Sequence, residues 1–289
     1  MNKEKSTSDI LYLSAQLSKK DEYKPFWNRL KLILTKNKIE YRMIDNTRDI
    51  WSRDYMPIQI NDDEFIQFTY FPDYLISPKH IAELTIPSEI VANFKGKITN
   101  SRLIIDGGNI TKSKSKLILT KKIYKENSNL LQKTINNELR KLLKVKDIFI
   151  LPIFPFDYTG HSDGMVRFVN ENQLLVADYS KESKSWQKKM KTALDKIEKA
   201  GIELIPFPNI ISTKKNKYGD CTAIGIYINF AQIGKHILFP QFDIMNDEKA
   251  LKKIKEIYKE PEYNVIPILS NEIAEYGGVL NCITWNIRQ

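Results

Sequence analysis

The stretch that decides the fold is Gly277-Gly278-Val279-Leu280-Asn281-Cys282-Ile283-Thr284-Trp285, close to the C-terminus. Two adjacent glycines indicate a tight turn, because glycine adopts backbone conformations that other residues avoid. The apolar and β-branched residues that follow favour a strand. The pattern therefore predicts a turn that delivers Cys282 onto a strand.

A comparable unit recurs four times upstream, each time with a polar residue where a strand is expected to begin. The five marker residues are Asp54, Asp106, Asp163, Asn229 and Cys282, at intervals of 52, 57, 66 and 53 residues. Such spacing is typical of circular repeat architectures, in which each unit buries one face against its neighbours. We therefore expect an α/β chain of repeated hairpins, helices and strands whose marker residues converge on a central axis.

The individual elements are predicted from hydrophobic periodicity. We expect helices near 26–34, 129–143, 181–200 and 247–259. The expected strands lie near 10–15, 40–44, 58–60, 65–68, 103–110, 117–120, 147–152, 161–169, 174–177, 202–206, 224–233, 237–240 and 263–267. The N-terminal strand is expected to close the last hairpin. Because no linker separates the units, we expect a single domain over residues 1–289.

The composition is that of an ordinary globular protein, with 42% hydrophobic and 28% charged residues among 289. The N-terminus lacks the apolar segment of a signal peptide, and no apolar run is long enough to cross a membrane. We therefore expect a cytoplasmic protein with no membrane partner. Two cysteines and three histidines show neither a disulfide framework nor a zinc spacing, so no metal or other cofactor is expected.

The formal charge of +10 raises the question of nucleic-acid binding. The lysines are scattered over predicted helices, however, without any recognisable nucleic-acid-binding motif. We therefore expect no specific nucleic-acid partner. The lysine-flanked apolar stretch from Lys112 to Lys125 is interpreted as a hairpin with solvated edges.

The converging residues include three carboxylates, an amide, a thiol and His161. In a strand, residues two apart face the same side, so His161 and Asp163 are expected to point together into the cavity. Crowded carboxylates repel one another unless a cation lies between them. Since no metal spacing is present, the cation is inferred to be the substrate.

A guanidinium suits these residues because carboxylates match its planar N–H donors in pairs. Two aspartates would keep it protonated and its central carbon electrophilic. The thiolate of Cys282 could then attack that carbon, helped by a nearby cation that favours the ionised thiol. An imidazole such as His161 could protonate the departing ammonia and then activate the hydrolytic water.

These residues resemble the agmatine deiminase and bacterial peptidylarginine deiminase family of the guanidino-group modifying superfamily. The matching segments are Trp51-Ser52-Arg53-Asp54, Asp106-Gly107-Gly108-Asn109, His161-Ser162-Asp163, Tyr227-Ile228-Asn229-Phe230 and Gly277-Gly278 with Cys282-Ile283-Thr284. The resemblance extends from about Ile10 to the end of the chain. It implies a five-bladed, pseudo-fivefold α/β propeller of ββαβ modules, the pentein fold, and cysteine-based hydrolysis that releases ammonia.

The resemblance also implies a role for each matching residue. Cys282 matches the nucleophile and His161 the general acid and base, while Asp54 and Asp163 match the pair that grips the guanidinium. Trp51 lies beside that pair, and Asn229 and Asn109 match the substrate site. Asp106 stands where the family often has a glutamate that supports the histidine. Met56 and Asn281 replace a glycine and a histidine common in the family, which bears on the choice of substrate.

Several polar residues are given structural interpretations instead. Arg53 and Arg167 are expected to be structural ion-pair partners, and Cys221 a buried small hydrophobe. His80 and His236 lie outside the repeat and are interpreted as non-catalytic.

The expected function is deimination of agmatine to N-carbamoylputrescine and ammonia, with a small cationic guanidine as the only expected partner. A peptidylarginine or other guanidine deiminase is the alternative within the enzyme class. A catalytically silent module of the same fold, binding a cationic ligand or a protein, is the alternative from another class. Homo-oligomerisation is left open.

Overall fold

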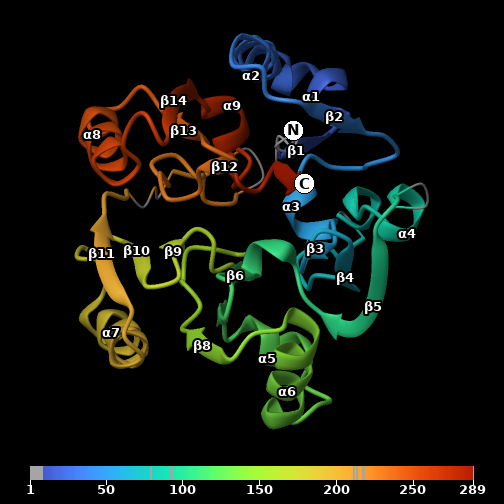
Figure 1. Cartoon of the computed structure of the whole chain (residues 1–289), viewed down its shortest axis with the longest axis vertical. Coiled ribbons are helices and arrows are strands. Elements are labelled where there is room, and N and C mark those ends of the chain that lie inside the picture. The colour runs from blue at the N-terminus through green and yellow to red at the C-terminus, as the bar shows by residue number, and fades with distance from the viewer. Residues whose placement is uncertain are drawn as a thin grey trace, which may run out of the picture.

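The computed structural model describes residues 9–78, 80–91, 94–210, 212, 214–216 and 219–288. Within these residues the chain forms five three-stranded sheets. Figure 1 shows the sheets arranged in chain order around a common centre, with the first and last strands in the chain, β1 and β15, side by side. No helix among the described residues is long and apolar enough to cross a membrane.

All five sheets share one topology. In each, the middle strand pairs antiparallel with one neighbour and parallel with the other. In neighbour order the sheets are β15(Thr284–Ile287)-β1(Ile10–Ser14)-β2(Tyr41–Ile44), β3(Ile58–Gln59)-β4(Glu64–Thr69)-β5(Lys97–Ile104), β6(Thr111–Lys112)-β7(Lys116–Thr120)-β8(Asp147–Leu151), β9(Val166–Asn170)-β10(Gln173–Ala177)-β11(Glu203–Phe207) and β12(Ala231–Ile233)-β13(His236–Gln241)-β14(Asn264–Leu269).

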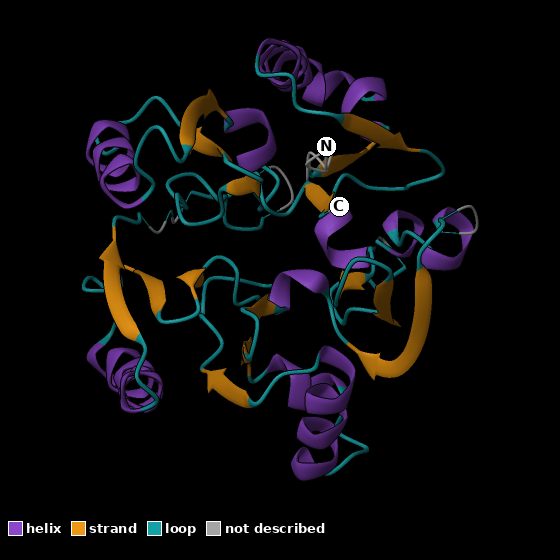
Figure 2. Ribbon diagram, viewed as in Figure 1, coloured by secondary structure: helices purple, strands orange, loops and turns teal. Residues whose placement is uncertain are grey.

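Helical segments connect the middle strand of each sheet to its parallel neighbour, because a parallel pair needs a crossover. Figure 2 shows the longer helices on the outside of the molecule. The α-helices are α1(Gln16–Lys19), α2(Lys24–Lys36), α3(Ser52–Tyr55), α4(Pro87–Ile90), α5(Lys122–Glu126), α6(Gln132–Leu143), α7(Lys184–Lys199), α8(Asp247–Ile257) and α9(Asn271–Ala274). The 3₁₀ turns are η1(Asp21–Tyr23), η2(Ile81–Glu83) and η3(Gly107–Asn109).

These pairings show the predicted recurrence of hairpin, helix and strand, and the N-terminal strand pairs with the last strand as expected. β1 pairs antiparallel with β15, with Ile10 opposite Ile287 and Leu13 opposite Thr284. The N-terminal strand therefore completes the sheet that begins directly after Cys282. Between β4 and β5 the structure adds η2 and α4, which the apolar periodicity did not indicate.

The outer helices form because their apolar residues recur on one face. In α6, Ile135, Leu139 and Leu143 are fully buried at intervals of four residues. In α7, Ser183 accepts a hydrogen bond from the N–H of Trp186 and caps the helix, whose buried face includes Met190.

The predicted hairpin between Lys112 and Lys125 is wrong in its second half. The chain pairs β6 with β7, but it then turns into α5 rather than ending in a solvated edge. Lys122, on α5, has a side chain only 3% exposed. The lysine-rich sequence predicts a solvent-facing edge, whereas carboxylates inside the protein hold this lysine.

Candidate active site

The five marker residues lie in turns before the first strand of each sheet, not on the strands themselves. Asp54 is in α3 before β3, and Asp106 precedes η3 and β6. Asp163, Asn229 and Cys282 precede β9, β12 and β15 by two or three residues. The expectation that His161 and Asp163 occupy a strand is therefore wrong, because β9 begins only at Val166.

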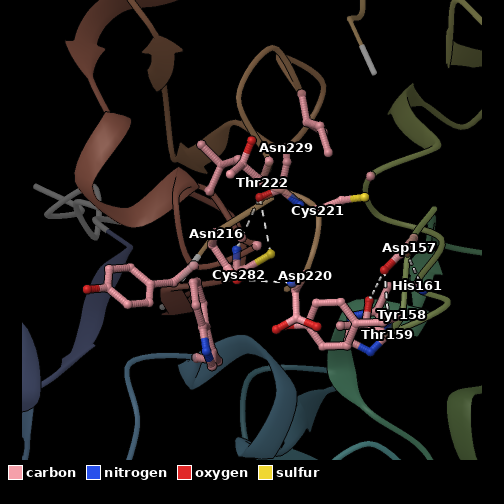
Figure 3. A pocket seen from close by; sticks show the side chains of 18 of the residues that line it. Asp157, Tyr158, Thr159, His161, Asn216, Asp220, Cys221, Thr222, Asn229 and Cys282 are labelled. Atoms are coloured by element: carbon pink, nitrogen blue, oxygen red, sulfur yellow. Dashed lines mark hydrogen bonds between the residues drawn. The ribbon is translucent and has the colours of Figure 1, made fainter. Parts of the chain in front are cut away.

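These turns nevertheless bring most of the predicted residues to one cavity of about 380 Å³. Its lining includes Cys282, His161, Asp54, Asp163, Trp51 and Asn229. Figure 3 looks into this cavity and shows Cys282 and Asn229 joined by a hydrogen bond. Asp106 and Asn109 are outside the lining: both are buried, and Asn109 Oδ1 accepts the N–H of Thr120 at 2.9 Å.

The glycine turn before Cys282 packs against the segment that contains Trp51 and Arg53. Gly277 has a φ of +92°, in the region that favours glycine. A Cβ on Gly278 would lie 2.4 Å from Cζ3 of Trp51, so only glycine allows this close approach. The backbone is further fixed by Arg53, whose N–H donates to the carbonyl of Cys282 at 3.0 Å.

The thiol of Cys282 is surrounded by acceptors. Sγ lies 3.3 Å from Asn229 Oδ1 and 3.8 Å from Asp163 Oδ2. Burial, together with the charges of Asp163 and Asp54, raises the pKa of the thiol well above its usual value. In the free protein this cysteine therefore holds its proton.

His161 is held from both ring nitrogens. Nε2 lies 2.8 Å from Asp106 Oδ2, and Nδ1 lies 3.7 Å from Asp54 Oδ1. The family often has a glutamate at this position to support the histidine. The side chain of Asp106 is shorter, yet it still reaches His161. Burial by itself would lower the pKa of His161, but the two carboxylates outweigh it and raise the pKa to about 9.

The two aspartates of the predicted guanidinium clamp are both destabilised as anions. Burial raises the pKa of Asp54 to about 7, although the N–H of Gly108 donates to its Oδ1 at 2.8 Å. Burial also raises the pKa of Asp163, whose Oδ2 accepts from Asn281 Nδ2 at 2.7 Å. A cation between these carboxylates would restore their charge.

The two arginines expected to be ion-pair partners form no salt bridge among the described residues, and they hold this arrangement from outside the cavity through hydrogen bonds instead. Arg167 Nη1 donates to the carbonyl of Phe230 at 2.6 Å and to Asn281 Oδ1 at 3.3 Å, and its guanidinium stacks 4.0 Å from the Phe230 ring centroid. Arg53 Nε donates to the carbonyl of Asn281 at 3.3 Å. Asn281 is therefore fixed against Asp163 rather than open to the substrate.

The cavity lining also contains residues that the repeat did not indicate. They include Asp157, Tyr158, His80, Asp220 and Cys221, and Figure 3 labels four of them. Cys221 is partly exposed, with Sγ 3.2 Å from Lys215 Nζ, so it is not the buried hydrophobe expected. Asp157 Oδ2 accepts the N–H of His161 at 3.0 Å; its position four residues earlier is the signal that could have suggested it.

A metal ion has no obvious place in the part of the chain that the structure describes. No group of three or more His, Cys, Asp or Glu residues there could hold one.

Comparison with solved structures defines the class of fold. The C. jejuni agmatine deiminase superposes with a TM-score of 0.76 at 22% identity, covering 98% of this chain and 94% of that one. DDAH from Pseudomonas aeruginosa superposes with a TM-score of 0.59 at 10% identity, covering 97% and 99%. The chain thus has the α/β fold of these guanidino-group modifying proteins.

Comparison of sequences defines the family. The pattern of the Porphyromonas-type peptidyl-arginine deiminases matches residues 14–287, and the chain belongs to this family. A Shewanella baltica protein provisionally named agmatine deiminase is 28% identical over 211 residues, which cover 64% of this chain. The match spans about half the length of that relative, 56%.

Proposed function

We propose that this protein is a cysteine-dependent deiminase that hydrolyses the guanidinium group of agmatine to N-carbamoylputrescine and ammonia. Cys282 is the nucleophile, His161 the general acid and base, and Asp54 and Asp163 grip the guanidinium. The five sheets are then the blades of a pseudo-fivefold propeller, and residues 1–289 form one deiminase domain. No cofactor takes part in the reaction.

One observation supports this proposal: the thiol, the imidazole and two carboxylates whose pKa values are raised by burial line the same cavity. A bound cation would stabilise both carboxylates in their charged form. Without it, burial and two nearby carboxylates keep the thiol protonated. A guanidinium between Asp54 and Asp163 would supply hydrogen-bond donors to both and lower the pKa of the thiol. The substrate would therefore ionise the nucleophile that attacks it.

The first half of the reaction follows from these positions. Substrate binding releases the thiol proton to solvent, and the thiolate adds to the guanidinium carbon. The protonated His161 gives its Nδ1 proton to one nitrogen, and the C–N bond breaks to release ammonia. The carbon remains bonded to Sγ as a positively charged thiouronium, and His161 is left neutral.

The second half restores the enzyme. Neutral His161 accepts a proton from water as the oxygen attacks the thiouronium carbon. Collapse of this adduct breaks the C–S bond, forms the carbamoyl C=O and passes the second oxygen-bound proton to the departing thiolate, which restores the thiol of Cys282. Overall, guanidinium and water become the urea-type product, ammonia and one proton. Asp106 holds the imidazole in place throughout, through its 2.8 Å contact with Nε2.

The charge of the cavity lining favours agmatine over free arginine. The acidic residues that line it are Glu22, Asp49, Asp54, Glu83, Asp157, Asp163 and Asp220. The basic residues among the described lining are Lys20, His80 and His161. A second ammonium at the far end of the substrate is attracted to such a lining, whereas the α-carboxylate of free arginine is repelled.

Ammonia release should be measured in parallel with agmatine, free arginine and an arginine peptide blocked at both ends. We expect the highest kcat/KM with agmatine. Turnover confined to the peptide would make peptidyl-arginine the substrate in place of agmatine, with the same reaction at the guanidinium group. Tight binding of one guanidine without turnover of any would overturn the enzyme assignment in favour of a silent binding module.

Asp163→Asn is expected to weaken agmatine binding and to slow turnover. The amide keeps the shape but loses the charge, and a charge-assisted hydrogen bond contributes about 1.5–3 kcal/mol. The corresponding loss in kcat/KM is roughly 10- to 100-fold. Asp195→Asn is the control, because Asp195 pairs with Lys191 on the exposed face of α7. A change in melting temperature alone, with kcat/KM intact, would remove Asp163 from the clamp.

A further inference from the structure

The histidine of the site belongs to a buried charge cluster that reaches well beyond the cavity. At its centre is Lys122, whose side chain is 3% exposed. Its Nζ lies 2.5 Å from Asp106 Oδ2, 3.4 Å from Glu126 Oε1 and 3.9 Å from Asp73 Oδ1. Nothing in the deimination steps above requires a lysine at this place.

One oxygen atom connects Lys122 to His161. Asp106 Oδ2 takes the Lys122 contact, the His161 contact at 2.8 Å and the Tyr74 hydroxyl at 3.4 Å. The other oxygen, Oδ1, is buried and has no hydrogen-bond partner among the described residues. All donors of this carboxylate therefore compete for the same atom.

We propose that Lys122 is a positioning residue for His161: by sharing Asp106 Oδ2, it limits how tightly that carboxylate holds the imidazole. This inference rests on the proposed function, since it assigns Lys122 to the acid and base step. Lys122 does not touch the cavity and acts only through Asp106.

The charges around Lys122 support this role. Asp106, Glu126 and Asp73 face it from three segments of the chain, and its Nζ lies 4.5 Å from the Tyr74 ring centroid. Burial raises the pKa of Glu126 to about 7, so Glu126 is only partly charged at neutral pH. The positive charge of Lys122 therefore chiefly balances the negative charge of Asp106. Burial alone would raise the pKa of Asp106, but His161 and Lys122 together lower it.

The proposed reaction requires that His161 is not held too strongly in its charged form. His161 must hold a proton to expel ammonia and must then exist as the neutral base that activates water. Asp54 and Asp106 both favour the charged form, and a histidine held too strongly in that form is a poor base. Lys122 opposes them, because its positive charge disfavours a second cation on the same carboxylate.

The test is the titration of His161 by NMR in the full-length protein without substrate. With three histidines in the chain, its signal can be assigned as the one lost in His161→Gln. We expect the pKa of His161 to rise by about 1 unit in Lys122→Met. In activity assays the same variant should lose kcat with little change in KM.

Lys116→Met is the matched control. Lys116 is also a buried lysine, with its side chain 10% exposed and its Nζ 3.1 Å from Glu171 Oε1. Both variants are expected to lower the melting temperature, but only Lys122→Met should move the His161 titration. Should Lys122→Met not fold, Lys122→Gln, which can still donate to Asp106 without a charge, takes its place with the same expectation.

An unchanged His161 titration in the Lys122 variants, or the same shift in Lys116→Met, would overturn the proposal. Failure of the proposed function has a different signature. In that case no guanidine is turned over by the wild-type protein, yet the titration of His161 still responds to Lys122.

Discussion

Replacing Cys282 by alanine is expected to abolish ammonia release from agmatine while leaving agmatine binding measurable. The chemistry needs a nucleophile at the guanidinium carbon, and Cys282 is the described residue that places a thiol beside both Asp163 and Asn229. The carboxylates that grip the substrate remain in Cys282→Ala. Isothermal titration calorimetry with agmatine and a steady-state ammonia assay check the two halves of this expectation.

The chain offers a control for this experiment in its second cysteine. Cys221 lines the same cavity, but its Sγ contacts Lys215 and takes no part in the proposed chemistry. Cys221→Ala is expected to keep most of the activity. Turnover by Cys282→Ala at a rate close to that of the wild type would refute covalent catalysis by this residue.

Replacing His161 by glutamine is expected to lower kcat by about 10²- to 10⁴-fold, the usual contribution of a general acid and base. The amide cannot transfer protons in either half-reaction. KM is expected to change much less, because Asp54 and Asp163 still hold the guanidinium. His80→Gln is the matched control, since His80 lines the cavity but pairs with Glu83 at 3.6 Å.

The pH dependence supplies an independent check on His161. The free protein holds both protons, because the thiol has a raised pKa and His161 a pKa of about 9. Reaction requires loss of the thiol proton alone, so kcat/KM should rise with pH and level off near pH 9, where His161 also loses its proton. In His161→Gln the levelling should be absent. A wild-type profile that falls between pH 7 and 9 would contradict this protonation scheme.

The repeat could be predicted from sequence because each unit carries its own local signals. Apolar runs, helical periodicity and glycine-containing turns recur at similar intervals, and the pairing of β1 with β15 follows once the units are counted. Local patterns did not locate the start of each first strand, however. His161 precedes a short turn that ends at Val166, and apolar residues in a turn look like those in a strand.

The residues around the nucleophile were predictable for a different reason. Cys282, Asp54 and Asp163 occupy equivalent places in separate repeats, and His161 lies two residues before Asp163, so their convergence follows from the architecture. Asn109 also belongs to a repeat turn, yet it is used inside the protein to bond the N–H of Thr120. Position in the repeat therefore brings a side chain near the centre but does not fix which way it points.

Residues from irregular segments could not be found by this reasoning. Asp220 and Cys221 reach the cavity from a loop with no counterpart in the repeat. Lys122 stood in a run of lysines and gave no sign of burial. Glu126 is its neighbour one turn along α5, but only the fold reveals that Asp106 and Asp73 also meet it, since these two residues are distant in sequence and lie outside α5.

The most direct test of covalent catalysis by Cys282 is intact-protein mass spectrometry on enzyme quenched with acid during turnover of agmatine. Covalent catalysis predicts a transient adduct with the mass of agmatine less one ammonia, located on the peptide that contains Cys282 and absent from Cys282→Ala. Ammonia production by the wild-type protein with no adduct at any quench time, together with activity that survives in Cys282→Ala, would contradict it.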